Sequence, residues 1–218
     1  MKKMGKLIAL EGPDTSGKTT TINKLKAALP IIFENETFIF TREPGNLLQG
    51  GNNSSEKIRE ILLRDESLTA LDQAKLFASA RACHVRDIVE ELKKGNNVIT
   101  DRFILSSLVY QGMTLGYDKV LSLNENILLK LKNENIDIHN IVFYLDKNTY
   151  EERMSNKKKD AMELVDEETI NARLNFHADE HFLKALNIGN IYHVDANKKI
   201  DDTVMQTLKY IYEILREN

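Results

Sequence analysis

A glycine-rich segment near the start of the chain contains the residue types that bind a polyphosphate. Residues 12–19, Gly-Pro-Asp-Thr-Ser-Gly-Lys-Thr, match the pattern G-x-x-x-x-G-K-[ST] at every fixed position. The two glycines let backbone N–H groups turn toward phosphate oxygens, and a helix beginning near Gly17 would point its positive end at them. We expect Lys18 to contact the β- and γ-phosphates of a nucleoside triphosphate, and the Thr19 hydroxyl to bind Mg²⁺.

A carboxylate, Asp101, directly follows a candidate strand, Val98–Thr100. An acidic residue at such a place can hold Mg²⁺ directly or through water. An aspartate at a strand end can also cap the next helix, and Asp101 taken alone fits both interpretations equally well. The arginine that comes next, Arg102, favours a role in phosphate chemistry.

Four of the nine arginines fall where strand ends or helix faces would surround one crevice. Arg42 belongs to the segment Thr41–Gly45 (Thr-Arg-Glu-Pro-Gly) at the end of a candidate strand, and Arg59, Arg81 and Arg102 follow along the chain. The carboxyl ends of strands in an open α/β sheet face the ligand crevice. Because arginine can bind phosphate through two parallel hydrogen bonds, the set predicts a second anionic site beside the phosphate loop.

Short runs rich in β-branched and aromatic residues alternate with longer helical segments along the chain. The expected strands are 6–11, 37–41, 98–100, 141–145 and 191–194. The expected helices are 19–29 (ended by Pro30), 56–64, 69–94 (with a capping box of Thr69 and Asp72), 103–111, 124–132, one from about 149, 167–186 and 201–215. This order predicts a three-layer α/β fold in which helices flank a five-stranded parallel sheet. We expect a single domain over residues 1–218, with a short lid at about 153–165.

The composition is that of an ordinary globular chain. It has 218 residues, 42% of them hydrophobic and 29% charged, and its formal net charge of −3 argues against nucleic acid as a partner. The apolar run Leu7–Leu10 is too short for a secretion signal, and no segment approaches the ~18 apolar residues of a membrane span. We therefore expect no membrane partner. The single cysteine, Cys83, excludes an intrachain disulfide, so we expect a cytoplasmic location.

These segments together resemble the thymidylate kinase family of P-loop nucleoside monophosphate kinases, over nearly the whole chain. The residues that carry the resemblance are Glu11–Thr20, Thr41–Gly45, Glu56–Arg59, Leu76–Arg81 with His84 and Val85, Asp101–Phe103, Ser106 and Ser107, and Tyr110–Gly112. The Arg-Glu-Pro-Gly and Tyr-Gln-Gly segments, in this order and spacing, are quite specific to that family. The resemblance implies phosphoryl transfer from ATP to dTMP with Mg²⁺, in dTTP biosynthesis, by a homodimer.

The resemblance also implies roles for individual residues. The ATP-binding residues would be Gly12, Pro13, Asp14, Thr15, Ser16, Gly17, Lys18, Thr19 and Thr20, with Asp195, Ala196 and Asn197 beside adenine. The dTMP-binding residues would be Asp14 at the 3′-OH, Arg42, Arg59 and Arg102 at the phosphate, Phe77, Arg81, Ser107 and Gln111 at the base, together with Glu43, Pro44 and Phe103. Mg²⁺ would be bound by Thr19, Asp101 and Glu11, and Lys18, Arg102 and Asp14 would act in catalysis. The ordinary alternative for Phe77 is that its ring packs in the core. The ordinary alternative for His84 is that it makes a structural hydrogen bond.

The chain departs from the family pattern at the cation that neutralises the transferring phosphoryl group. The family places an arginine either in the phosphate loop, where this chain has Thr15, or in the lid, where residues 160–163 (Asp-Ala-Met-Glu) lack one. Arg153 is our first candidate for this catalytic role, ahead of Lys157–Lys159, because a planar guanidinium can bridge two phosphate oxygens. Phe103 replaces a tyrosine of the family, so the exclusion of ribose would rest on the shape of its ring.

Three other functions share the phosphate loop. A deoxynucleoside kinase has a neutral hydroxyl as acceptor, which needs a base rather than an arginine cluster. A nucleoside monophosphate kinase for another base would keep the arginines. A non-enzymatic P-loop switch is disfavoured because the guanine-reading pattern Asn-Lys-x-Asp fails at Ile200, the fourth residue of the segment 197–200.

Overall fold

The structure is a computed structural model that describes residues 3–45, 54–65, 67–155 and 165–216. It contains two compact units, each built from two stretches of the chain. The first unit holds the chain up to Ile8 and from Asn35 to Asp137, and the second holds Ala9–Glu34 and the chain from Ile138 onward. The single domain stays a prediction, and most of the expected lid lies outside the described residues.

Five strands form one sheet in the order β2-β3-β1-β4-β5. They are β1 (Leu7–Glu11), β2 (Phe38–Arg42), β3 (Asn97–Asp101), β4 (Ile138–Tyr144) and β5 (Asn190–Asp195). In the first unit β2 pairs with β3 in parallel, and in the second β4 pairs with β5 in parallel. All five residues of β1 are buried, as expected of a central strand in a parallel sheet. The predicted α/β fold, a five-stranded parallel sheet flanked by helices, is confirmed.

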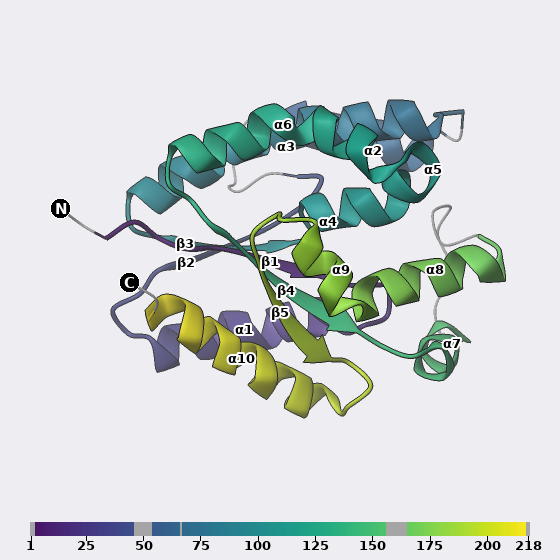
Figure 1. Ribbon diagram of the computed structural model, residues 1–218. Coiled ribbons are helices and arrows are strands. Elements are labelled where there is room, and N and C mark those ends of the chain that lie inside the picture. The colour runs from purple at the N-terminus through teal and green to yellow at the C-terminus, as the bar shows by residue number, and fades with distance from the viewer. Residues whose placement is uncertain (1–2, 46–53, 66, 156–164, 217–218) are drawn as a thin grey trace. The chain divides into compact units, whose positions relative to one another are not determined.

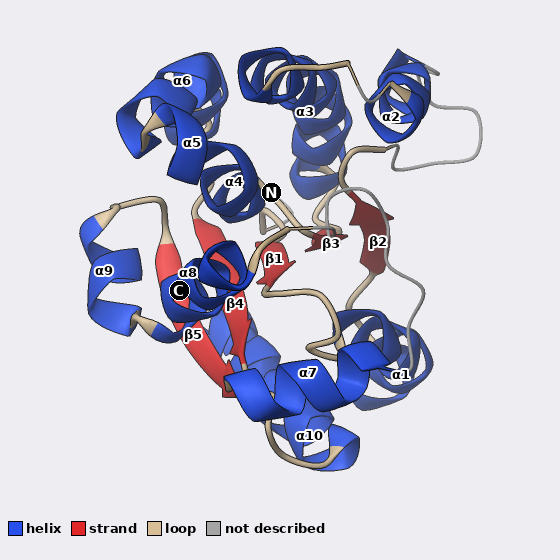
Figure 2. Ribbon diagram, turned by 90° about the vertical axis from the view of Figure 1, so that its right-hand side faces the viewer, coloured by secondary structure: helices blue, strands red, loops and turns tan. Residues whose placement is uncertain are grey.

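In the first unit, α3 (Ala70–Lys93) packs against α2 (Ser54–Arg64), α6 (Tyr117–Asn133) and β3 (Figure 2). The predicted capping box at the start of α3 is confirmed: the Thr69 hydroxyl accepts from the N–H of Asp72, and the Asp72 carboxylate accepts from the N–H of Thr69. A hydrogen bond from the Thr69 side chain holds the pKa of Asp72 below its usual value.

The helix expected over 103–111 is present, but it is not a regular α-helix. The segment begins with α4 (Ile104–Ser107), continues as a π-helical turn at Leu108–Gly112, and ends in α5 (Met113–Leu115). A π turn adds one residue to the hydrogen-bonded loop and occurs often at functional sites. Hydrophobic periodicity gives no sign of such an insertion, so the sequence pattern reads the segment as regular helix.

The second unit contains α1 (Lys18–Ile32), α7 (Lys147–Ser155), α8 (Glu167–Ala178), α9 (Glu180–Ala185) and α10 (Ile200–Arg216). Helices α1 and α10 pack against each other, while α8 contacts β4, and α9 and α10 contact β5 (Figure 1). Within the part of the chain that the structure describes, no helix is both long enough and apolar enough to cross a membrane.

Two helix ends in the second unit differ from the prediction. Helix α1 continues for two residues past Pro30, because a proline removes only its own N–H and the N–H of Phe33 still donates to the carbonyl of Leu29 at 2.9 Å. The single helix expected over 167–186 is two helices, because Asp179 leaves the helical conformation and caps α9 by accepting from the N–H of Phe182 at 2.9 Å.

Candidate nucleotide and acceptor sites

The phosphate loop lies in the second unit, between β1 and the first residue of α1. Gly12 has φ +150°, and a Cβ placed there would lie 2.7 Å from the carbonyl oxygen of Phe143, so only glycine fits without a backbone shift. Gly17 has φ +86° and directly precedes α1. The loop therefore makes a tight turn that ends at the amino end of a helix, where the dipole favours an anion.

The ammonium of Lys18 lies within this loop. Its Nζ donates to the carbonyl oxygens of Gly12 at 2.9 Å and Pro13 at 2.8 Å, and to Ser16 Oγ at 3.3 Å. The residue is only 6% exposed. A phosphate oxygen carries more negative charge than a carbonyl oxygen, so a bound polyphosphate would be the stronger partner for this cation.

Arg153, in the last turn of α7, contacts the same loop. Its Nη1 donates to the carbonyl oxygen of Thr15 at 3.2 Å. Thr15 has φ +62°, a left-handed conformation that costs a non-glycine residue about 1–2 kcal/mol. Hydrogen bonds from Thr149 lower the pKa of Asp146, and the charge of Arg153 adds to that shift. The competing candidates Lys157–Lys159 lie outside the described residues.

The loop that follows β5 is held in shape by its own side chains. Asp195 Oδ1 accepts from the backbone N–H of Asn197 at 3.1 Å and from its side-chain amide at 2.9 Å. Asn197 Oδ1 in turn accepts from the N–H of Asp146 at 2.8 Å. Ala196 is buried, and its N–H donates to the carbonyl oxygen of Tyr144. These bonds fix the loop that the sequence predicts beside adenine.

In the first unit, Arg42 and Asp101 are neighbours at the carboxyl ends of β2 and β3, where their Cα atoms are register partners. Arg42 is exposed. One carboxylate oxygen of Asp101, Oδ1, is buried and has no hydrogen-bond partner among the described residues. A buried carboxylate oxygen in this state fits a bound cation or an ordered water.

The other two expected Mg²⁺ ligands lie in the second unit. Thr19 is exposed in the first turn of α1, and Glu11 is buried at the end of β1. The described residues contain no group of three or more acidic, histidine or cysteine side chains that could hold a metal. Mg²⁺ usually binds through one or two protein oxygens, phosphates and waters, so Thr19 and Glu11 offer the kind of oxygen that binds an ion arriving with a nucleotide.

Arg102 combines a strained backbone with a supported side chain. Its φ is +69°, and its carbonyl oxygen accepts from Thr100 Oγ1 at 2.9 Å. Its guanidinium donates to Ser106 Oγ at 3.1 Å and lies 5.2 Å from the centre of the Tyr110 ring. Strain of this kind persists only where the surrounding structure holds it, and it concentrates at functional sites.

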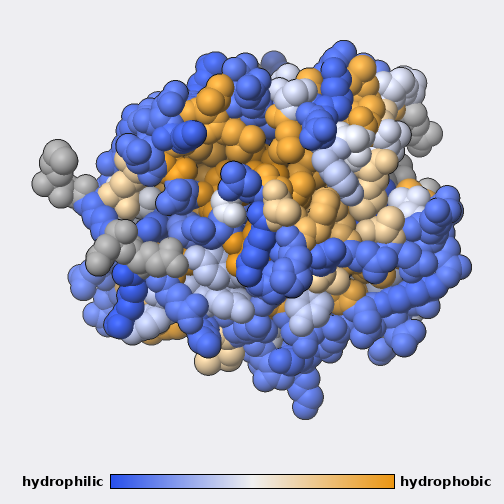
Figure 3. All heavy atoms as spheres, viewed as in Figure 1, coloured by the Kyte–Doolittle hydropathy of each residue, from blue (hydrophilic) through white to orange (hydrophobic). Residues whose placement is uncertain are grey.

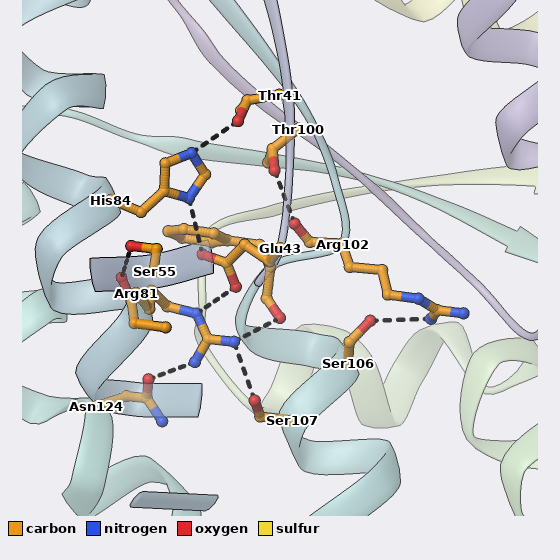
Figure 4. A network of polar contacts seen from close by, with 12 residues as sticks. Thr41, Glu43, Ser55, Arg81, His84, Thr100, Arg102, Ser106, Ser107 and Asn124 are labelled. Atoms are coloured by element: carbon orange, nitrogen blue, oxygen red, sulfur yellow. Dashed lines mark hydrogen bonds and ion pairs between the residues drawn. The ribbon is translucent and has the colours of Figure 1, made fainter. Parts of the chain in front are cut away.

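A buried polar network joins Glu43, Arg81 and His84 (Figure 4). Arg81 Nε donates to Glu43 Oε2 at 2.6 Å, and the two side chains are only 1% and 4% exposed. Arg81 Nη2 donates to Ser107 Oγ at 3.0 Å. His84 Nδ1 lies 3.5 Å from Glu43 Oε1, and His84 Nε2 lies 2.8 Å from Thr41 Oγ1. Glu43, expected among the dTMP-binding residues, is here the partner of Arg81, and His84 is hydrogen-bonded as its ordinary interpretation predicts.

The candidate base-reading residues differ in what they offer a ligand. Gln111, in the π turn, is 1% exposed, and both atoms of its amide lack a hydrogen-bond partner among the described residues. Phe103 is fully buried with its ring 5.6 Å from the guanidinium carbon of Arg81, and Phe77 is half-buried on α3. A buried amide without partners costs free energy, so Gln111 fits a ligand that carries both a donor and an acceptor.

Arg59, the third expected phosphate ligand, lies on α2 and donates through Nη1 to the carbonyl oxygen of Pro44 at 3.0 Å. The peptide bond between Glu43 and Pro44 is cis. This contact ties α2 to the segment that follows β2.

Sequence reasoning missed Asn124 on α6 and gave Thr41 on β2 no role of its own. Asn124 Oδ1 accepts from Arg81 Nη1 at 2.6 Å. Asn124 occupies a buried position in a helix whose other buried residues are apolar, and a polar residue at such a position is the signal that could have identified it. The contact of Thr41 with His84 had no signal in the sequence, because threonine is an ordinary strand residue.

Known families, sequences and structures contain proteins that are similar to this chain. The family model described as thymidylate kinase matches residues 10–207 of this chain. The chain is 33% identical to the thymidylate kinase of Malacoplasma penetrans, over 97% of this chain and 98% of that one. It is 32% identical to the thymidylate kinase of Ligilactobacillus salivarius, over 95% and 97% of the two chains. The crystal structure of thymidylate kinase from Ehrlichia chaffeensis shares its fold, with a TM-score of 0.70, 22% identity, and coverage of 95% of this chain and 99% of that one.

Proposed function

Because the chain belongs to the thymidylate kinase family, we propose that it transfers the γ-phosphoryl group of ATP to dTMP and so produces dTDP and ADP. Membership in this family makes it a phosphotransferase of nucleotide biosynthesis. The observation that best supports dTMP as the substrate that receives the phosphoryl group is the buried amide of Gln111. Its nitrogen and its oxygen both lack a hydrogen-bond partner among the described residues. Thymine offers both an acceptor and a donor on its pairing edge, which such an amide can match.

The chemistry needs charge and position rather than a general base. The attacking atom is an oxygen of the dTMP phosphate, whose second pKa is roughly 6, so it is already ionised at neutral pH. The main obstacle is the repulsion between two polyanions. Catalysis is then a matter of holding the substrates in line and placing cations around the transferring group.

On the ATP side, the proposed binding residues are the loop residues Gly12–Thr20. The buried ammonium of Lys18 supports this role. It now donates to carbonyl oxygens of the loop, and phosphate oxygens of ATP would take their place as acceptors. The loop of Asp195–Asn197 would pack beside adenine. Mg²⁺, when bound, would neutralise phosphate charge, and Thr19, Asp101 and Glu11 are the residues proposed to hold it.

On the acceptor side, Arg42, Arg59 and Arg102 are proposed to bind the dTMP phosphate. The best support is Arg102, whose strained backbone is held by Thr100 and whose side chain is steadied by Ser106. Asp14 is proposed to bind the deoxyribose 3′-OH.

Around the base, Phe77 would stack on thymine while Arg81, Ser107 and Gln111 bind its polar edge. Phe103 supports this pocket from beneath Arg81, because its ring is fully buried against the guanidinium. Glu43 and Pro44 would help to position the arginines of the site, since Glu43 binds Arg81 and the carbonyl oxygen of Pro44 accepts a hydrogen bond from Arg59.

Arg153 is proposed as the cation over the transferring phosphoryl group. Its contact with the carbonyl of Thr15 supports the proposal, because it brings a guanidinium to the loop position at which the family can carry an arginine. The hydrogen bond uses one nitrogen of the guanidinium and leaves others for phosphate oxygens.

A homodimer is the proposed assembly. Hydrophobic side chains gather over α6 on the face shown in Figure 3, and Leu129 of α6 is 47% exposed. An exposed apolar area on a globular chain favours a protein partner. Light scattering should give twice the chain mass of 25.0 kDa. The cytoplasmic location stays a prediction that rests on the single cysteine.

An acceptor panel tests the proposed function. ADP release should be measured by a coupled assay with dTMP, dUMP, dGMP, CMP, thymidine and no acceptor. We expect dTMP to be best, with dUMP only modestly slower, because the methyl group contributes about 1 kcal/mol. Equal activity on dGMP would contradict the base assignment, preference for thymidine would indicate a deoxynucleoside kinase, and acceptor-independent ADP release would indicate an ATPase.

A further inference from the structure

One polar residue interrupts the buried face of helix α6. The buried positions of this helix are Val120, Asn124, Ile127 and Leu131, which is the spacing of a single helical face. Asn124 is 1% exposed. Asparagine is a poor helix former, and its buried amide gains stability only when both its polar atoms are bonded. Its presence at a core position calls for an explanation in terms of what it binds.

Both polar atoms of Asn124 are in use, and the two bonds fix its orientation. Nδ2 donates to the carbonyl oxygen of Val120, one turn earlier in the same helix, at 2.8 Å. Oδ1 therefore faces Arg81 and accepts from its Nη1 at 2.6 Å (Figure 4). A bond to a charged donor at this length is among the stronger hydrogen bonds in proteins.

Asn124 completes the set of acceptors that fixes the plane of the Arg81 guanidinium. Nε is bound by Glu43, Nη2 is bound by Ser107 and by the carbonyl of Phe103, and Nη1 is bound by Asn124. These contacts use four of the five N–H donors of an arginine. The fifth N–H belongs to Nη1, the nitrogen that Asn124 holds, so Asn124 sets its direction.

The same arrangement fixes the polarity of Ser107. Arginine has no acceptor atom, so Ser107 Oγ must accept from Arg81 and keeps its own hydrogen for another partner. Arg81 and Ser107 therefore both present donors. Such a pair binds an oxo group and leaves an amino group unmatched.

We propose that Asn124 is a positioning residue that aims Arg81 and, through it, Ser107, so that the acceptor pocket selects a pyrimidine with an oxo group over one with an amino group at the same ring position. This role rests on the proposed function. Asn124 itself does not contact the substrate in this scheme. Its effect should appear in the choice between substrates rather than in the handling of ATP.

The test compares dTMP with 5-methyl-2′-deoxycytidine monophosphate, which has the same methyl group and sugar but an amino group at the 4-position. The variants Asn124→Leu and Asn124→Ala remove the acceptor, and Asn124→Asp keeps it. Asn126→Ala, at an exposed position of the same helix, is the matched control. For each protein, kcat and KM are measured for both monophosphates and for ATP, together with the melting temperature.

We expect the wild-type protein to prefer dTMP in kcat/KM by at least about a hundredfold. Asn124→Leu and Asn124→Ala should lower this ratio at least tenfold with the KM for ATP unchanged, while Asn124→Asp and the control keep it within about threefold. Apolar leucine extends the buried face of α6, so the Leu variant should fold even if the Ala variant does not. An unchanged ratio in a folded Leu or Ala variant with a lowered melting temperature would overturn the proposal and leave Asn124 a purely structural role. A wild-type protein without activity on dTMP would instead overturn the proposed function and this inference with it.

Discussion

Replacing Arg102 with glycine should remove activity on dTMP at little cost to stability. At φ +69° the backbone of Arg102 is in the left-handed region, where a non-glycine residue loses about 1–2 kcal/mol that glycine does not. Against this gain, the variant loses the hydrogen bond to Ser106 Oγ, about 1 kcal/mol, and the contact with the Tyr110 ring, about 0.5–1 kcal/mol. The greater freedom of glycine in the unfolded chain costs a further 0.5–1 kcal/mol, roughly.

The losses exceed the gain by about 1 kcal/mol, so Arg102→Gly should melt about 2–4 °C below the wild-type protein. Arg102→Ala loses the same contacts and keeps the strain but avoids the unfolded-state cost of glycine, so it should melt about 1.5–3 °C below the glycine variant. Both variants lose a charged contact with the acceptor phosphate. Such a contact is worth about 2–4 kcal/mol, or roughly 30- to 1000-fold in kcat/KM for dTMP.

Steady-state kinetics and melting curves on the same preparations measure both effects, and the KM for ATP should stay unchanged. Two results would refute the reasoning. Near-wild-type kcat/KM for dTMP in the glycine variant would show that Arg102 does not bind the phosphate of dTMP. A glycine variant that melts below the alanine variant would show that the backbone at Arg102 is not strained.

The remaining predictions concern other parts of the chain. Lys18→Ala should lower kcat at least a hundredfold in a protein with an unchanged circular dichroism spectrum, and normal turnover in that protein would exclude the loop mechanism. Arg153→Ala should lower kcat at least tenfold with little change in the KM for dTMP, while Glu151→Ala on the same helix should be silent; unchanged kcat with a lower melting temperature would assign Arg153 a structural role and point to Lys157–Lys159. Thr69→Ala should lower the melting temperature near neutral pH, because the Thr69 bond depresses the pKa of Asp72 from 3.8 and so stabilises the fold above that value. That stabilisation is lost as pH falls through the lowered pKa, so the difference between wild type and variant should shrink below about pH 4, and a difference that stays constant to pH 2 would contradict the assignment.

The sequence predicted those features of the fold that depend only on residues close together in the chain. The phosphate loop needs glycines and a following helix, and the capping box of Thr69 and Asp72 needs only residues three apart, so both were readable from the sequence. Asp179 shows the limit. It lies inside an apparently continuous helical pattern, and only its backbone conformation and its bond to the N–H of Phe182 end α8 and start α9.

The candidate site was predictable as a set of residue types but not as a network. The sequence placed Arg81 and Glu43 at one crevice as separate ligands. Their mutual bond, and the bond from Arg81 to Asn124, join residues that are 38 and 43 positions apart, and no short-range pattern encodes such pairing. The π turn around Gln111 is similar, because one extra residue in a helical turn follows from packing rather than from periodicity.

The most direct test of the central claim is the fate of the γ-phosphoryl group in the unmodified protein. Phosphorus NMR of a reaction with equimolar Mg-ATP and dTMP follows ATP, ADP, dTDP and inorganic phosphate together. Direct transfer predicts dTDP and ADP in a one-to-one ratio, with no inorganic phosphate formed in parallel. Inorganic phosphate appearing with ADP in the absence of dTDP would contradict the assignment of the protein as a dTMP kinase.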